Sequence, residues 1–315
     1  MDLTVKNTLS VVIPTFNEEG NIELLYNKLR ETIDPLGLDA LEFIFVDDGS
    51  HDDSLKIIKR IAAHDAQVKY ISFSRNFGHQ LALKAGLDHA RFQGVISLDA
   101  DLQHPVELIP KMIEKWRAGV DVVYSKRIDK TLPWFKRTSS KLFYRIANSL
   151  SQIKLEYGVA DFRLMDQKVI QALLMYKETN LFIRGIIPSL GFQQEAIEYS
   201  PNKRHAGKTK YSFSKMLRFA STGITSLSAK PLYFSIYFGV FFAFLAFIYS
   251  LYAIYAFAFG NETVPGWTSI IASILLIGGI QLIMIGIIGV YLGKVFAQSK
   301  GRPNYIIADK NTLDD

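Results

Sequence analysis

Two long apolar runs near the C-terminal end constrain the fold of this chain more than any other feature. Residues 231–259 and 267–292 contain no charged side chain. Each run exceeds the ~20 residues that a helix needs to cross ~30 Å of hydrocarbon. The alternative, two buried helices of a soluble core, fits poorly because such helices are usually shorter. The runs therefore predict a two-helix transmembrane hairpin over residues 231–293.

The charges beside the hairpin predict its orientation. The connecting loop, residues 260–266, contains one acidic residue and no lysine or arginine. Basic residues accumulate on the cytoplasmic side of membrane proteins. We therefore expect a multi-pass protein of the plasma (inner) membrane, with both termini and the N-terminal domain in the cytoplasm. The flanking basic residues are Lys215, Arg218 and Lys230 before the hairpin, and Lys294, Lys300 and Arg302 after it.

Two basic amphipathic segments are candidates for the membrane surface. In residues 212–229 and 134–153, apolar side chains recur at helical spacing beside lysine and arginine. Helices of this kind lie in the headgroup plane, although a core-facing helix with a solvated basic face gives the same pattern. Because the first segment adjoins a span, we expect an interfacial helix over residues 212–230. For residues 134–153 both interpretations stay open.

Glycines in the second apolar run indicate close helix packing. Small residues let the backbones of membrane helices approach each other. We therefore expect the chain to form a homo-oligomer. The glycines are Gly278, Gly279, Gly286, Gly289 and Gly293.

The N-terminal part alternates short β-rich runs with amphipathic helical stretches. This alternation predicts a mostly parallel sheet covered by helices, a Rossmann-like α/β fold over residues 1–211, with residues 294–315 as a cytosolic tail. The expected strands are 9–14, 42–47, 68–73, 95–99 and 121–125, and the expected helices are 18–33, 52–63, 80–91 and 106–117. Ligands of such sheets bind beyond the carboxyl ends of the strands. Polar motifs follow three of the strands, at residues 14–19, 47–50 and 99–103.

The motif at residues 99–103 predicts a metal site. Asp99 and Asp101 are two residues apart at a strand end, so their carboxylates project to the same side. Gln103 can add an amide oxygen. Mg²⁺ and Mn²⁺ prefer oxygen ligands and share them with phosphates, where the metal neutralises a departing nucleoside diphosphate. The structural alternative is a turn or helix cap before Pro105.

The other two motifs predict contacts to a nucleotide. Carboxylates such as Asp48 and Glu18 can accept hydrogen bonds from a base or ribose, and Phe16 can contact a base. Part of each motif has a structural alternative, because Asp52 can cap the next helix and Gly49 can adopt an unusual φ.

Together these motifs resemble family 2 glycosyltransferases. The sequences that carry the resemblance are PTFNEE (14–19), VDDGS (46–50), SRNFGHQ (74–80), LDADLQHP (98–105) and DFRLMD (161–166). They are most similar to the polyprenyl-phosphate branch, which includes dolichyl-phosphate mannose synthase-like enzymes and bacterial bactoprenol glucosyltransferases. The two spans and the segment PNKRHAGKTKYS (201–212) match the bactoprenol group, whereas Ala160 stands where many relatives have glycine. The resemblance implies a GT-A fold, a UDP-sugar donor, a polyprenyl phosphate acceptor, Mg²⁺ or Mn²⁺, inversion at the anomeric carbon and no nucleic acid partner.

The resemblance also assigns roles to residues. It places nucleotide-sugar binding on Pro14, Phe16, Glu18, Asp47, Asp48 and Asp99, and metal binding on Asp99, Asp101 and Gln103. It places a phosphate contact on Arg127, and it puts Arg204 and Lys210 in a loop that closes over donor and acceptor. It also puts Asp161 and Arg163 in the active-site strand.

The acceptor's chemistry decides what these residues must do. A sugar hydroxyl needs a general base, whereas a phosphate monoester, with a second pKa of ~6, is already ionised at neutral pH. Arg127, Arg204 and Lys210 are therefore expected to hold phosphates, an assignment that suits the net charge of +6. Asp161 is expected to act as a base or an orienting group.

The predicted reaction is transfer of a hexose, glucose from UDP-glucose, to undecaprenyl phosphate at the cytoplasmic membrane face. A processive polysaccharide synthase is the nearest alternative, but the chain has two spans and no Gln-x-x-Arg-Trp motif. A catalytically idle membrane scaffold is a second alternative, and the intact acidic motifs argue against it. A nicotinamide-binding enzyme is not expected, because no G-x-G-x-x-G follows the first strand.

Overall fold

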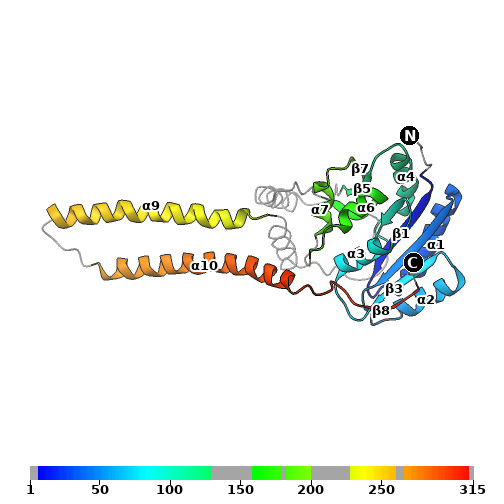
Figure 1. The fold of residues 1–315 in the computed structure, drawn as a ribbon, viewed down its shortest axis with the longest axis horizontal. Helices are drawn as coiled ribbons and strands as arrows, with labels where there is room; N and C mark the ends of the chain where they lie inside the picture. Colours follow the sequence, from blue (N-terminus) through cyan, green and yellow to red (C-terminus); the bar gives the residue numbers. More distant parts are fainter. Residues whose placement is uncertain (1–5, 129–157, 179–181, 200–227, 260–265, 312–315) are drawn as a thin grey trace.

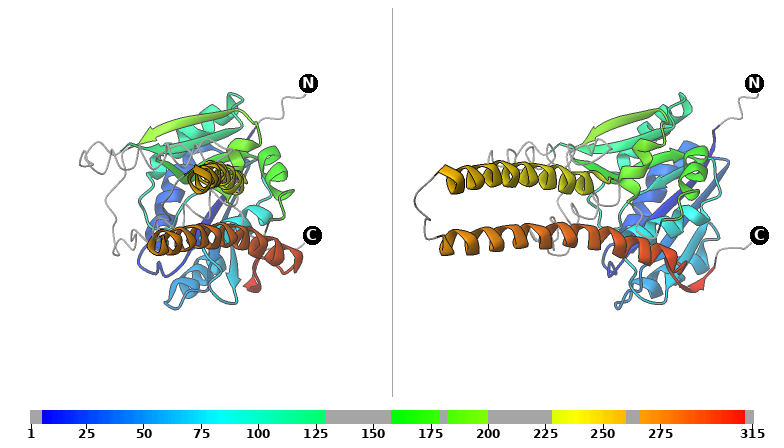
Figure 2. Two further views of the ribbon diagram at one scale, coloured as in Figure 1. Left: turned by 90° about the vertical axis from the view of Figure 1, so that its left-hand side faces the viewer. Right: turned by 60° about the vertical axis from the view of Figure 1, so that its left-hand side comes forward.

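The computed structural model of the 315-residue chain describes residues 6–128, 158–178, 182–199, 228–259 and 266–311. An α/β domain forms one end of the molecule, and two long helices project from it side by side (Figures 1 and 2). The first and the last described strands both belong to the α/β domain.

One eight-stranded sheet forms the centre of the α/β domain, in the order β7-β5-β6-β4-β1-β2-β3-β8. Strands β1 to β5 and β7 run in one direction, while β6 and β8 run antiparallel to their neighbours. The predicted mostly parallel sheet is therefore confirmed. The strands are β1 (Thr8–Thr15), β2 (Ala40–Asp47), β3 (Val68–Phe73), β4 (Gly94–Ser97), β5 (Val122–Arg127), β6 (Val159–Asp166), β7 (Gln194–Tyr199) and β8 (Ile307–Lys310).

Helices cover both faces of the sheet. Helices α1 (Ile22–Ile33), α2 (Ser54–His64) and α4 (Ile109–Arg117) pack on one face, and α3 (His79–His89), α6 (Gln167–Leu174) and α7 (Ile183–Ser189) on the other. Alternation along β1 shows how two cores arise: Val11 belongs to one core and Val12 to the other, and both are fully buried. Successive side chains of a strand point to opposite faces, so each buried strand serves both cores.

The five strands predicted from the sequence pattern are all present, and each of the four predicted helices is present but shorter than predicted. The first helix begins at Ile22, because residues 18–21 form a turn in which Asn21 N donates to Glu18 O. The fourth stretch divides into a 3₁₀ turn, Val106–Leu108, and α4, which has a proline in its first turn. The pattern did not predict β6, β7 or β8, although the resemblance placed Asp161 and Arg163 in a strand.

Two apolar helices, α9 (Lys230–Phe259) and α10 (Trp267–Ser299), follow the domain. Their most apolar windows have mean hydropathies of 2.0 and 2.1, and no residue of these windows whose side chain is described is buried. Both helices are long enough to span a bilayer, as predicted. Helix α10 continues to Ser299, beyond the expected end at residue 292, and the predicted tail then returns to the sheet as β8 (Figure 1).

Several predictions concern residues outside the described part of the chain. These predictions are the phosphate contacts of Arg204 and Lys210. They also include the two amphipathic segments, 134–153 and 212–229. The loop that connects α9 to α10 is described only at Gly266. The expectations for these residues stay predictions.

Candidate active site

The register of β6 brings two aspartates together at the edge where the parallel strands end. Ser97, the last residue of β4, pairs with Arg163 of β6. Because the two strands are antiparallel, the same register extended by two residues places Asp99 opposite Asp161. The Ser97 hydroxyl donates to the Asp161 carbonyl over 2.6 Å, which fixes this crossing.

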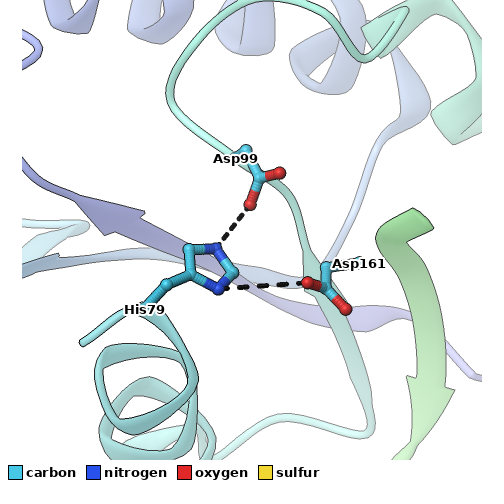
Figure 3. Close-up of side chains that lie close together, drawn as sticks. All are labelled: His79, Asp99 and Asp161. Atoms are coloured by element: carbon cyan, nitrogen blue, oxygen red, sulfur yellow. Dashed lines mark hydrogen bonds and ion pairs between the residues drawn. The ribbon is translucent and has the colours of Figure 1, made fainter. Parts of the chain in front are cut away.

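His79, the first residue of α3, lies between the two aspartates (Figure 3). Its Nε2 is 2.7 Å from Oδ1 of Asp99, and its Nδ1 is 3.9 Å from Oδ2 of Asp161. The other oxygen of Asp99 lies 3.2 Å from Nε2 of His104. The Tyr199 hydroxyl is 3.3 Å from Nδ1 of that histidine. The Asp99 carboxylate is thus held between two imidazoles.

Asp161 is buried and bound by an arginine from another element. Arg184 of α7 donates from Nε and Nη2 to the two Asp161 oxygens, each over 2.6 Å. Nη2 of Arg163 lies 3.7 Å from Oδ1 of Asp161 and donates to the Ala160 carbonyl. The Asp161 side chain is only 2% exposed, whereas that of Arg184 is 31% exposed. The pair therefore joins the buried end of β6 to the surface of α7.

The opposite charges of His79, Asp99 and Asp161 stabilise one another and shift the pKa of each group. The groups around His79 partly desolvate it, although 44% of its side chain is exposed, and this opposes its protonation. The hydrogen bond and charge of Asp99, with the charge of Asp161, nevertheless raise its pKa to about 9. Burial would raise the pKa of Asp99, yet the bonds to His104 and His79 hold that pKa well below its usual range. Burial would also raise the pKa of Asp161, but the charge and hydrogen bonds of Arg184 outweigh this effect and lower that pKa. At neutral pH the site therefore contains an imidazolium between two carboxylates.

A second group of carboxylates ends β2. Asp48 accepts backbone N–H bonds from Phe77 over 2.7 Å and from Gly78 over 2.9 Å. Burial raises the pKa of Asp48 in spite of these bonds. Asp47 accepts from the Ser72 hydroxyl of β3 over 3.1 Å. Residues 74–78, which lead from β3 to His79, thus connect the predicted nucleotide-binding turn to the Asp99 site.

Gly49 has a φ of 68°, as the sequence predicted. A Cβ at this position would lie 2.5 Å from the carbonyl carbon of Arg75, so only glycine lets the turn pack against residues 74–78. Asp52, the other residue with a predicted structural role, accepts from Ser54 N over 3.0 Å at the start of α2.

The first two motifs are joined to each other by hydrogen bonds. Asn17 N donates to the Ser50 hydroxyl over 3.0 Å, and Glu18 N donates to the Ser54 hydroxyl over 2.9 Å. The Glu18 carboxylate accepts from Asn21. Asn17 has a positive φ of 54°, a conformation that asparagine tolerates better than most residues. Part of each motif therefore has a structural role beside any contact with a nucleotide.

Three further predicted residues lie at the carboxyl ends of the parallel strands. Pro14 is buried within β1, whereas Phe16, just after the strand, is 37% exposed and contacts His51 edge-on. Arg127 ends β5 with an exposed side chain, and its backbone N–H donates to the Gly158 carbonyl at the start of β6. Phe16 and Arg127 are therefore accessible from solvent.

The residues present fit a divalent metal ion. Among the described residues, ligand atoms of His79, Asp99 and Asp161 lie within 4.8 Å of one another. The predicted set shares only Asp99 with this group, since the Asp101 carboxylate accepts from the backbone and side-chain N–H groups of Gln103 over 3.2 and 2.7 Å. Ionised carboxylates suit Mg²⁺ or Mn²⁺, and a metal held by His79 would take the place of its proton.

Sequence reasoning missed three residues of this site. His79 and His104 lie in the SRNFGHQ and LDADLQHP stretches that carried part of the resemblance, but no role was assigned to either. Arg184 follows no recognised motif, and only the three-dimensional position of α7 brings it to Asp161. An arginine that serves a distant aspartate leaves no signal in local spacing.

A doubly wound α/β sheet with an acidic site at its carboxyl edge, joined to two apolar helices, is the arrangement expected of a membrane-associated glycosyltransferase. Residues 10–174 match glycosyl transferase family 2. A bactoprenol glucosyl transferase of Shigella phage SfX is 41% identical over 304 residues, which cover 96% of this chain and 99% of the relative. The chain belongs to glycosyl transferase family 2, and the resemblance drawn from its motifs is confirmed.

Other similar proteins include two further bacterial sequences and one solved structure. An uncharacterized glycosyltransferase of Bacillus subtilis, YkcC, is 42% identical, with 95% of this chain and 92% of the relative covered. A prophage bactoprenol glucosyl transferase homolog of Escherichia coli is also 42% identical, with 95% and 98% covered. The crystal structure of TarS residues 1–349 from S. aureus has 18% identity and a TM-score of 0.44, with 62% of this chain and 59% of that chain covered.

Proposed function

We propose that this enzyme transfers a hexose, glucose from UDP-glucose, to a polyprenyl phosphate such as undecaprenyl phosphate, with inversion and with Mg²⁺ or Mn²⁺. The names of the bactoprenol glucosyl transferases support the acceptor, since these relatives match this chain over nearly its full length. The two apolar helices support a reaction at a membrane, at its cytoplasmic face by the charge distribution.

The observation that carries the proposal is the ion pair between Asp161 and Arg184. A carboxylate that accepts two hydrogen bonds from a guanidinium has a lowered pKa and is a weak base. An acceptor hydroxyl needs a base, whereas an ionised phosphate does not. The site therefore suits a phosphate acceptor, and Asp161 serves as an orienting group for His79 and Arg184.

The roles of the other residues follow from their positions. Asp99 would hold the metal together with Asp101 and Gln103, or with His79 and Asp161. Such a metal would neutralise the charge of the departing diphosphate. The nucleotide lies on the residues that follow β1 and β2, where Phe16 is exposed to a base. Arg127, Arg204 and Lys210 align the acceptor phosphate with the anomeric carbon. The residues assigned to the nucleotide sugar are Pro14, Phe16, Glu18, Asp47, Asp48 and Asp99.

The test is an assay of the purified full chain with labelled UDP-glucose and undecaprenyl phosphate. The expected product is a lipid-linked monosaccharide of inverted anomeric configuration, formed in the presence of Mg²⁺ or Mn²⁺. Undecaprenol, which lacks the phosphate, is the matched acceptor control and should remain unmodified. A long polymer would instead indicate a processive synthase. No product from any nucleotide sugar in a panel would indicate a scaffold.

A further inference from the structure

The segment that follows α10 pairs with an edge of the sheet instead of leaving the domain. In β8, Lys310 is opposite Ile71 and Asp309 is opposite Ser72 of β3. Beyond the strand, Asn311 accepts from Tyr70 N through its side chain and donates its own N–H to the Tyr70 carbonyl. Residues 304–311, which we call the strap, therefore form an antiparallel edge beside β3 (Figure 1).

Tyr305 inserts between β3 and α3. Its ring is stacked on Phe73, with centroids 5.0 Å apart and an interplanar angle of 17°. Phe73 in turn meets Phe77 edge-on at 5.6 Å. The Tyr305 hydroxyl donates to Asp88 of α3 over 2.8 Å. Burial raises the pKa of Tyr305, so the hydroxyl keeps its proton and remains a donor at physiological pH.

The strap touches the elements that position the candidate nucleotide and metal residues. Ser74 N donates to the Ile306 carbonyl over 3.0 Å, which anchors the first residue of loop 74–78. That loop supplies both N–H groups bound by Asp48 and ends at His79. Ser72, opposite Asp309, donates to Asp47. Each of these links is a direct contact. Displacement of the strap therefore removes support from the carboxylates at the end of β2 and from His79 beside Asp99.

We infer that the strap holds loop 74–78, and through it Asp48 and His79, in the geometry that binds the nucleotide sugar, with Tyr305 as its main positioning residue. That the ligand is a nucleotide sugar rests on the proposed function, whereas the support of loop 74–78 by the strap does not. Tyr305 touches no substrate; it acts through Phe73, Phe77 and Asp88. Just before the strap, Gln298 of α10 donates to the Lys177 carbonyl that follows α6, so the end of α10 also contacts the α/β domain.

The first test measures hydrogen exchange in the ligand-free full chain. Tyr305→Ala should increase exchange of the amides in residues 74–78, which include the two donors to Asp48. Ile306→Ala is the matched control, because the Ile306 side chain is 53% exposed and the change keeps the carbonyl that accepts from Ser74. Equal protection of residues 74–78 in the two variants would overturn the inference.

The second test separates the two substrates. In Tyr305→Ala the KM for UDP-glucose should rise about tenfold, while the KM for undecaprenyl phosphate should stay within about twofold. Tyr305→Phe keeps the stacked ring and loses the bond to Asp88, so its effect should be smaller. Equal increases in both KM values, or none, would contradict a role specific to the nucleotide side.

Separate controls distinguish a variant that fails to fold from a failure of the proposed function. If Tyr305→Ala does not fold, Tyr305→Phe and Asn311→Ala take its place, and unchanged exchange of residues 74–78 in both would reject the strap. If the unmodified protein transfers no sugar, the proposed function fails, but the exchange experiment still decides whether the strap supports the loop.

Discussion

At Asp161 a single contact determines how the side chain can act. Arg184→Met would remove two hydrogen bonds from a carboxylate that is 2% exposed, while Arg163 at 3.7 Å and His79 at 3.9 Å remain among its described neighbours. Removing one partner of a fully buried ion pair costs ~3–5 kcal/mol, and the partial exposure of Arg184 reduces this to about 2 kcal/mol. We expect that loss in denaturant unfolding, together with a lower kcat. Arg184→Lys keeps the charge without the bidentate geometry and should be intermediate; unchanged kcat and stability in Arg184→Met would remove the pair from the mechanism.

We also expect sugar transfer to require a divalent metal ion at the Asp99 site. EDTA should abolish transfer, and added Mn²⁺ or Mg²⁺ should restore it, because the carboxylates after β4 need a cation to share with the diphosphate. With Asp101 and Gln103 as metal ligands, Asp101→Ala should remove metal-dependent transfer with little change in the unfolding midpoint; retained transfer would assign the metal to Asp99, His79 and Asp161. Asp39→Asn, an exposed change before β2 at the opposite edge of the sheet, is the control. Full activity in EDTA would exclude the metal.

Among the elements, α3 depends most closely on a single glycine. A Cβ on Gly86 would overlap Cγ1 of Val12 in β1 and lie 3.2 Å from Cγ2 of Val46 in β2. Gly86→Ala should therefore push α3, with His79 at its first position, away from the sheet and destabilise the fold by ~1–3 kcal/mol. Val12→Ala in the same chain should recover part of this loss. Gly20→Ala, which meets no atom within 4 Å, is the control in thermal unfolding.

The elements also show how far sequence reasoning can reach. The strands β1 to β5 were predictable because each is a short apolar run bounded by polar turns, and β1 to β4 alternate with amphipathic helices. Strand β8 was not, because its partner β3 lies far away along the chain and its residues are polar or only partly buried. The same limit applies to the site. Asp99 follows a strand and could be found locally, whereas its neighbour Asp161 depends on the register of an antiparallel strand.

For the whole molecule, the absence of cysteine allows a direct test of orientation. We expect Asn261→Cys, in the loop between the two apolar runs, to react with an impermeant maleimide in intact cells. Asp39→Cys, in the α/β domain, should react only after permeabilisation. This result follows from the excess of basic residues on the side of the domain. Labelling of Asp39→Cys in intact cells would reverse the proposed topology.

The length of α10 determines how far the domain stands from the lipid tails. Its 33 residues extend ~50 Å at 1.5 Å per residue, compared with a hydrocarbon layer of ~30 Å. Under the proposed topology, a helix of this length crosses the tails and also the layer of headgroups, and the sheet begins beyond them. A lipid phosphate can therefore approach the carboxyl edge of the sheet by lateral diffusion while its chain stays in the bilayer. Under the proposed function, the rate should then follow the density of acceptor within the membrane surface, and dilution with inert lipid should slow the reaction at constant bulk concentration.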